Sequence, residues 1–220
     1  MQPRHTELRE GVISTCVEMN NLGINQGTSG NVSARLEDCF LITPSGIPYE
    51  DLETDHIVEM DMDGRYDDAV KPSSEWKMHL AIYHRFAQAQ AIIHTHGVFC
   101  TALACQRTNI PAFHYMVAVA GGNDIPCADY ATFGTQMLAD NMLAALVGRR
   151  ACLLANHGMI CYGENLPNTL RLAVEVETLA KQYWHTRQLG EPVLLSDKEL
   201  DRVRGLFAGY GQESSKAGER

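Results

Sequence analysis

Stretches with apolar residues at helical spacing alternate along the chain with short apolar runs that are typical of buried strands. Helices are expected at residues 6–22, from residue 74 onward, and at 97–105, 133–146, 166–188 and 197–207. Strands are expected at residues 31–36, 39–43, 57–62, 91–94 and 151–155. Strands and helices mix throughout with short connections, which predicts an α/β fold.

The chain length of 220 residues suggests one large domain or two small ones. No repeat, low-complexity linker or break in composition divides it, so we expect a single domain over residues 1–220, with about 211–220 as a flexible tail. A chain of this length buries about 70% of its unfolded surface. Its core therefore needs neither disulfides nor a metal.

The charge balance argues against some classes of function. With 18 Lys and Arg against 27 Asp and Glu, the net charge is −9, which is a poor fit to a nucleic-acid-binding protein or to a polybasic membrane anchor. The first ten residues contain no apolar run, so no signal peptide is expected, and no run of 18 apolar residues predicts a transmembrane helix. The seven cysteines form no CxxC pair, so reduced thiols and a cytoplasmic location are expected.

The strongest chemical signal is the sequence His94-Thr95-His96 at the end of a predicted strand. Side chains at positions i and i+2 of a strand point to the same side, so both imidazoles can reach one metal ion. His157 follows a second apolar strand and could supply a third ligand, leaving coordination positions open for chemistry. An incidental HxH pair is also common, and the spacing alone leaves both interpretations open.

Two polar segments also have two interpretations. Ser74 could simply cap a helix beginning at Glu75, or the hydroxyls of the segment PSSE and the helix amides could bind an anion. The segment GTSGN at 27–31 is either a plain turn or a place where backbone amides approach a phosphate. The apolar run after Tyr115 could be a core strand, while Tyr115 could be a proton donor or structural, and His114 stays open.

Several motifs in a fixed order resemble the class II aldolase/adducin family. They are LGINQGTSGNVS, LITPSGIPYE, KPSSEWKMHLAIY, AIIHTHG, IPAFHYMVAVAGGNDIPCADYATFGT and LLANHGMI, and they run from about residue 8 to 210. The resemblance implies a single-domain fold with a central, mainly antiparallel sheet flanked by helices. It also implies a homotetramer with active sites between subunits.

The resemblance further implies roles for individual residues. His94, His96 and His157 would bind Zn²⁺, and Glu75 would be the catalytic acid/base and could also ligate zinc in the empty enzyme. Tyr115 would reach the site from a neighbouring subunit as a proton donor. Residues that would hold the substrate phosphate are Thr28, Gly30, Asn31, Ser45, Gly46, Ser73 and Ser74. The aldehyde pocket would contain Phe133, Phe207 and Tyr210.

The implied reaction is reversible cleavage of a ketose 1-phosphate, a small sugar phosphate, to dihydroxyacetone phosphate and an aldehyde. The pattern YATFGT favours an L-fuculose 1-phosphate type of substrate, with 5-deoxyribulose or 5-methylthioribulose 1-phosphate as the alternative. A pentulose-phosphate 4-epimerase is disfavoured because Glu75 stands where such enzymes have Asp. A non-catalytic adducin-like module is disfavoured because all three histidines and Glu75 are present.

Overall fold

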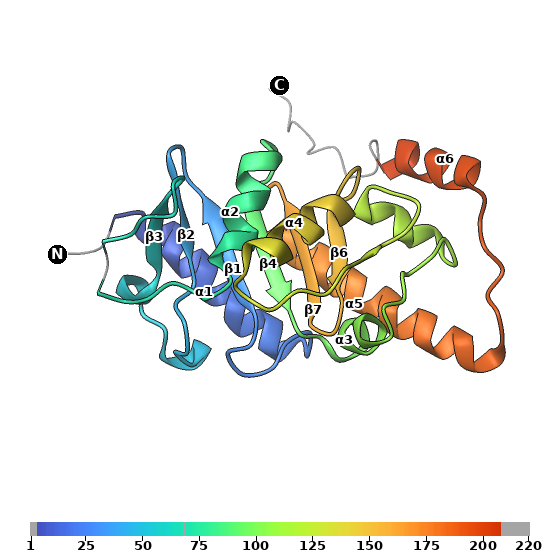
Figure 1. Ribbon diagram of the computed structural model, residues 1–220, viewed down its shortest axis with the longest axis horizontal. Helices are drawn as coiled ribbons and strands as arrows, with labels where there is room; N and C mark the ends of the chain where they lie inside the picture. Colours follow the sequence, from blue (N-terminus) through green and yellow to red (C-terminus); the bar gives the residue numbers. More distant parts are fainter. Residues whose placement is uncertain (1–3, 68, 208–220) are drawn as a thin grey trace, which may run out of the picture.

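A seven-stranded sheet runs through the centre of the protein (Figure 1), whose computed structural model describes residues 4–67 and 69–207. The strands are β1 (Asn31–Arg35), β2 (Cys39–Ile42), β3 (Val58–Asp61), β4 (Ala91–Thr95), β5 (Cys127–Ala128), β6 (Ala151–Leu154) and β7 (Gly158–Gly163). Their order across the sheet is β3-β2-β1-β4-β7-β6-β5. Every neighbouring pair is antiparallel except β5 and β6, which are parallel.

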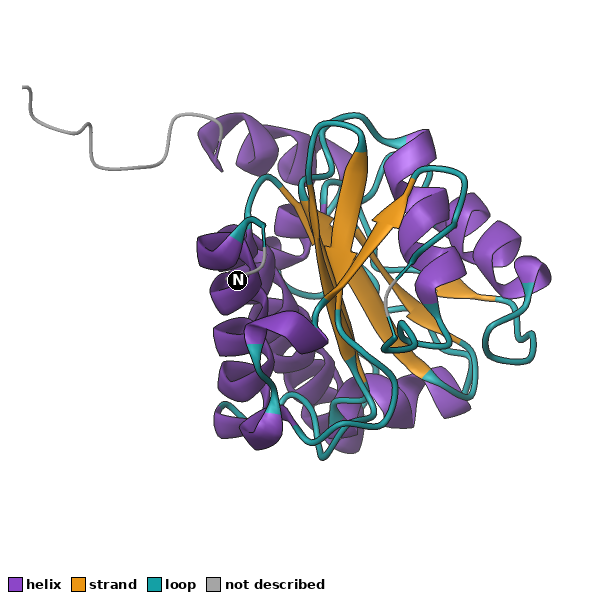
Figure 2. Cartoon of the chain, turned by 90° about the vertical axis from the view of Figure 1, so that its left-hand side faces the viewer, coloured by secondary structure: helices purple, strands orange, loops and turns teal. Residues whose placement is uncertain are grey.

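Helices cover both faces of this sheet (Figure 2). They are α1 (Thr6–Asn21), α2 (Trp76–Arg85), α3 (Val98–Cys105), α4 (Gln136–Ala145), α5 (Leu166–Leu189) and α6 (Asp197–Phe207). Short 3-10 helices are η1 (Tyr49–Asp51), η2 (Thr54–His56) and η3 (Tyr115–Ala120). Residues of α1, α3 and α5 belong to one apolar cluster, and residues of α2 and α4 belong to a second one.

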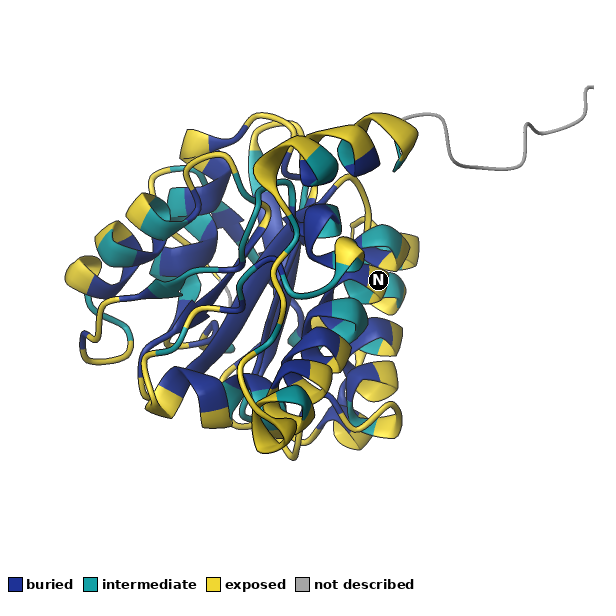
Figure 3. Cartoon of the chain, turned by 90° about the vertical axis from the view of Figure 1, so that its right-hand side faces the viewer, coloured by how far each residue is buried: buried dark blue, intermediate teal, exposed yellow. Residues whose placement is uncertain are grey.

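The strands separate these two clusters by strict alternation. In β4, Ile93 packs with α1, α3 and α5, whereas Ile92 packs with α2 and α4. His94 has the same parity as Ile92 and therefore lies on the α2 and α4 side of the sheet. The strands are buried along their length and the helices expose their outer faces (Figure 3). The predicted α/β fold with a mainly antiparallel sheet between helices is thus confirmed.

Several local predictions need correction. The helix expected to begin at Glu75 begins at Trp76, and Ser74 does not cap it. The helix expected from Phe133 begins at Gln136, because a turn with Gly134 in the left-handed region precedes it. The run after Tyr115 is the 3-10 helix η3 and not a strand. Strand β7, which follows His157, was not predicted as a strand.

The remaining features concern the ends of the chain and its exterior. Helix α6 begins as predicted, with the Glu199 amide donating to Ser196 Oγ at 3.3 Å. The tail expected at about 211–220 lies outside the described residues. Among the helices described, none is both long and apolar enough to cross a membrane.

Candidate active site

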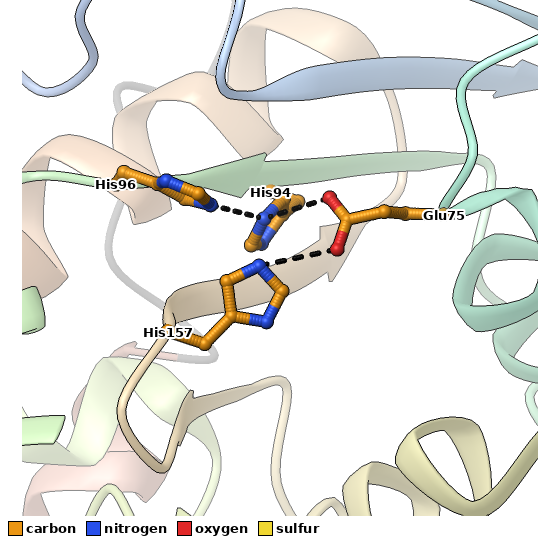
Figure 4. A group of neighbouring side chains, drawn as sticks. All are labelled: Glu75, His94, His96 and His157. Carbon is orange, nitrogen blue, oxygen red and sulfur yellow. Dashed lines mark hydrogen bonds and ion pairs between the residues drawn. The ribbon is translucent and has the colours of Figure 1, made fainter. Parts of the chain in front are cut away.

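Three histidines and one glutamate converge at one end of the central strands (Figure 4). The rings of His94, His96 and His157 form a near-threefold arrangement, in which every pair of centroids is 4.8 Å apart. The ring planes stand at 70° to 79° to one another. One ligand atom from each histidine and from Glu75 lies within 4.8 Å of all the others.

The strand ends place the three histidines. His94 is in β4, and His96 lies just beyond its end on the same side of the chain. His157 sits in the tight turn between β6 and β7, and β7 pairs with β4 up to Thr95. Gly158 permits this approach, because a Cβ there would collide with the Thr95 carbonyl oxygen and the His96 ring.

Glu75 comes from the other side of the centre, at the position before α2. Its side chain makes no capping bond to that helix and turns instead toward the histidines. Glu75 Oε2 lies 3.1 Å from His94 Nε2 and accepts a hydrogen bond from Asn31 Nδ2 at 3.0 Å. Its Oε1 lies 3.1 Å from His157 Nε2. Only 5% of Glu75 is exposed, so these neighbours decide its chemistry.

The surroundings set the protonation of the centre. Burial acts to raise the pKa of the Glu75 carboxyl, but His94 and His157 outweigh it and hold this pKa well below its ordinary value. Burial and the two neighbouring histidines lower the pKa of His96 to about 4. His96 is therefore a neutral imidazole at pH 7. A neutral imidazole is the donor state that metals bind.

The donor set fits a divalent metal ion. His94 Nδ1 lies 2.8 Å from the Met159 carbonyl oxygen, so Nδ1 carries the proton and Nε2 presents its lone pair inward. Glu75 Oε1 is buried without a hydrogen-bond partner among the described residues. Nε2 of His94 and of His96 are 2.9 Å apart. Tetrahedral ligands at bonds of about 2.0–2.1 Å stand roughly 3.3 Å apart, close to this spacing.

A cavity of about 320 Å³ opens beside the centre. It is lined by Ser29, Ser74, Glu75, His96, Tyr130, Ala131, Phe133, Asn156 and His157. Phe133, predicted for the aldehyde pocket, is here and is 65% exposed. Phe207 instead lies beside Tyr115, with ring centroids 6.4 Å apart, and neither lines this cavity. Tyr210 lies outside the described residues.

The residues predicted to hold phosphate lie on segments that flank the centre. The segments at Pro44 and Pro72 pair, with the Ser73 amide donating to the Thr43 carbonyl at 2.9 Å. This pairing brings Ser45 and Gly46 toward Ser73 and Ser74. The segment of Thr28, Gly30 and Asn31 enters β1, and Asn31 is the direct neighbour of His94 across the sheet. His114, left open before, accepts the Met116 amide and caps η3.

One group of polar residues behind Glu75 was missed. The spacing of His79 and Tyr83 in the sequence is typical of the packing face of a helix, and nothing in the sequence indicates a role for Ser33. The structure buries all three and joins them to Asn31 by hydrogen bonds. The available signal was a histidine and a tyrosine one turn apart on a helix, matched by Asn and Ser at i and i+2 on a strand.

In this layered α/β fold, three histidines at the ends of strands meet a buried carboxylate at the position before α2, beside an open cavity. Such an arrangement is that of a metal-binding enzyme. The chain belongs to the Class II Aldolase and Adducin N-terminal domain family, which it matches over residues 10–184. Family and site together make it an aldolase of the aldehyde-lyase class, with a metal-binding group of one glutamate and three histidines.

Relatives and solved structures are similar to this chain over nearly its whole length. The chain is 50% identical to the L-fuculose phosphate aldolase of Escherichia coli (strain K12), over 93% of this chain and 96% of the relative. It is 49% identical to a 5-methylthioribulose-1-phosphate/5-deoxyribulose-1-phosphate aldolase of Rhodospirillum rubrum, over 94% of each chain. A solved L-fuculose 1-phosphate aldolase superposes with a TM-score of 0.90 at 40% identity, covering 94% of this chain and 98% of its own.

Proposed function

We propose that the protein is a Zn²⁺-dependent aldolase that reversibly cleaves L-fuculose 1-phosphate, or a closely similar ketose 1-phosphate, to dihydroxyacetone phosphate and an aldehyde. The observation that carries this proposal is the buried Glu75 carboxylate, held 3.1 Å from both His94 and His157 beside an open cavity. Three imidazole nitrogens suit zinc among the divalent ions. The 50% identical relative named for fuculose phosphate supports the substrate.

Glu75 acts as the acid/base of the reaction. In the condensation direction its carboxylate removes a proton from the carbon beside the carbonyl of dihydroxyacetone phosphate, and in cleavage it returns that proton. The low pKa of Glu75 keeps the carboxyl ionised before substrate arrives. When bound, a divalent ion supplies Lewis-acid stabilisation for the negative charge that develops on the substrate oxygen.

The phosphate is bound without a cationic side chain. The residues assigned to it are Thr28, Gly30, Asn31, Ser45, Gly46, Ser73 and Ser74. Their hydroxyls and backbone amides, together with the nearby start of α2, supply partial positive charge at close range. The net charge of −9 acts at longer range and is screened beyond about 8–10 Å. An acidic protein can therefore bind this anion.

The active site is completed between subunits of a homotetramer. Tyr115 is half exposed and does not line the cavity of its own chain, which supports a role in a neighbour's site as proton donor to the aldehyde oxygen. Phe133, Phe207 and Tyr210 are assigned to the aldehyde pocket. The seven unpaired cysteines support a cytoplasmic location.

The second candidate substrate is a 5-methylthioribulose or 5-deoxyribulose 1-phosphate. The relative named for these compounds is 49% identical, so overall similarity hardly separates the two candidates. Both kinds of aldolase would act on the same ketose 1-phosphate end. The difference lies in the aldehyde portion, which faces the pocket of Phe133.

A cleavage panel tests the proposal. The metal-loaded enzyme is given the 1-phosphates of L-fuculose, L-rhamnulose, D- and L-ribulose, 5-deoxyribulose and 5-methylthioribulose, and kcat/KM is compared. We expect the highest value for L-fuculose 1-phosphate.

Glu75→Gln should keep the fold and bound metal but lose at least about 10²-fold in proton exchange at dihydroxyacetone phosphate. Undiminished exchange would remove Glu75 from the base role, and a metal-loaded enzyme without any cleavage would contradict the proposal.

A further inference from the structure

A continuous chain of hydrogen bonds runs from Glu75 into the core of the protein. Asn31 Nδ2 lies 3.0 Å from Glu75 Oε2, and Asn31 Oδ1 lies 2.6 Å from His79 Nε2. His79 Nδ1 lies 2.7 Å from Ser33 Oγ, which lies 2.7 Å from the Tyr83 hydroxyl. We call these five residues, Glu75, Asn31, His79, Ser33 and Tyr83, the polar chain.

Helix α2 and strand β1 build the polar chain between them. Asn31 and Ser33 are two residues apart in β1, so both face α2, and His79 and Tyr83 are one turn apart on that helix. His79 and Ser33 are completely buried, and Tyr83 is buried nearly as well. They lie on the face of the sheet whose apolar cluster contains Ile82 of α2, Phe40 of β2 and Ile92 of β4. Water therefore does not satisfy these polar groups, and each depends on its neighbour in the polar chain.

The hydrogen bonds have only one consistent direction. An ionised carboxylate accepts only, so the Asn31 amide must present its NH₂ group to Glu75 and its oxygen to His79. His79 must then carry its proton on Nε2, which makes Nδ1 an acceptor for the Ser33 hydroxyl. Ser33 in turn accepts from the Tyr83 hydroxyl. Every donor points toward Glu75, and each residue fixes the orientation of the next.

We propose that His79 is a positioning residue for the reaction, which holds the Asn31 amide in the orientation that donates to Glu75 Oε2. The inference rests on the proposed base role of Glu75. With Oε2 held by Asn31, the carboxylate keeps one rotamer and directs Oε1, which lacks a hydrogen-bond partner among the described residues, toward the centre. Without His79 the Asn31 amide is free to turn its oxygen toward the Glu75 carboxylate. The oxygens then repel each other, and the carboxylate leaves the position from which it acts as the base.

A purely structural role predicts a different outcome. Replacing one member of the polar chain leaves its partners unpaired and costs stability, but a chain that served only packing would show no loss of rate in the variants that still fold. A positioning role instead lowers kcat for proton transfer while the bound metal and KM are preserved. The two roles are therefore separated by comparing kcat, KM and metal content in folded variants.

The experiment uses the metal-loaded enzyme and measures proton exchange at dihydroxyacetone phosphate. We expect His79→Leu to lower kcat for exchange by about 10- to 100-fold, with KM changed less than about threefold and metal still stoichiometric. His79→Gln, whose amide can still donate to Asn31, should recover to within about threefold of wild type. Ser33→Ala should lower kcat about 3- to 10-fold. His84→Gln, the same change on the exposed side of α2, is the matched control and should match wild type.

A second readout does not need turnover. In ¹⁵N NMR spectra of the metal-loaded wild type, His79 should show a neutral ring protonated on Nε2, and a proton on Nδ1 would overturn the inference. Wild-type exchange in folded, metal-loaded His79→Leu would also overturn it. If His79→Leu does not fold, an unchanged rate in Ser33→Ala overturns it instead. Absence of exchange in the wild type would overturn the proposed function. The NMR result does not depend on turnover, so it tests the polar chain separately from the proposed function.

Discussion

The His79 imidazole is neutral because of where it lies. Burial is the main cause that lowers its pKa to about 3, and His94 adds to the effect while Glu75 opposes it. Its direct partners, Asn31 and Ser33, do not ionise, and burial raises the pKa of Tyr83, which lies behind Ser33. Below pH 6.5 the unfolded chain therefore takes up a proton at this residue that the folded protein does not.

This difference predicts how stability depends on pH. Because the unfolded state binds the extra proton, the contribution of His79 to stability is complete above about pH 6.5 and declines as the pH falls toward 3. We expect the free energy of unfolding of wild type, minus that of His79→Gln, to decrease by roughly 1.4 kcal/mol per pH unit between about pH 6 and 4. Urea unfolding of both proteins across this range measures it. A difference that stays constant with pH would contradict the prediction.

The residues of the metal centre differ in how far their sequence context reveals them. His94 and His96 could be found from spacing on a strand, because a period of two places them together. Their convergence with Glu75 depends on the pairing of β4 with β7 and on the position of α2, which no local pattern encodes. The resemblance to a family supplied Glu75. His79 was missed because helical spacing assigns a histidine to the buried face without naming its partner.

At the scale of elements, the long apolar runs were predicted and the short or irregular segments were not. Helices α1, α5 and α6 follow clear helical periodicity and begin and end close to the predicted residues. Strand β7 was missed because its residues directly follow the turn that bears His157 and overlap the motif LLANHGMI. Helix η3 has an apolar run too short to separate strand from helix by periodicity.

A carboxylate from α5 holds the start of α3, the helix that follows His96. Glu177 is buried and accepts hydrogen bonds from the backbone amides of Phe99 at 2.8 Å and Cys100 at 2.9 Å. Gly97 is needed here, because a Cβ at that position would collide with this carboxylate. The negative charge also suits the positive end of the helix. Glu177 thereby fixes the backbone next to His96.

Loss of this charge should therefore affect both stability and metal binding. We expect Glu177→Gln to lower the free energy of unfolding by about 1–2 kcal/mol, since a neutral amide keeps one acceptor but adds two unpaired donors. Metal affinity should fall as well, because His96 loses its support. Glu175→Gln, a half-buried neighbour on the same helix, is the control. Urea unfolding and metal titration measure both effects, and an unchanged Glu177→Gln would show that α3 does not depend on this contact.

At the scale of the whole molecule, the fold has two apolar layers that do not involve the metal centre. The clusters on the two faces of the sheet are buried, and the centre lies where the strands end. We expect His96→Ala to lose bound metal without unfolding. Its Tm should lie within about 4 °C of metal-free wild type, equal to roughly 1 kcal/mol. Added Zn²⁺ should raise the Tm of wild type but not of the variant, and a variant with stoichiometric zinc and full activity would contradict the ligand assignment.

The position of Tyr115 leads to a prediction about the assembly of subunits. If Tyr115 acts in the site of a neighbouring subunit, Glu75→Gln and Tyr115→Phe impair different halves of a shared site. A mixed oligomer then contains some sites with both native residues. For random mixing of equal amounts this fraction is about one quarter, because each of two subunits must be of the right kind.

Co-expression of the two variants with different tags, followed by purification over both tags, tests this assembly. We expect the mixed oligomers to recover about a quarter of the wild-type kcat, far above either variant alone. An oligomer of two differently tagged Glu75→Gln chains controls for effects of the tags. If Tyr115 served its own chain, every site in the mixture would lack one group, and mixed oligomers no more active than the two parent variants would establish that arrangement.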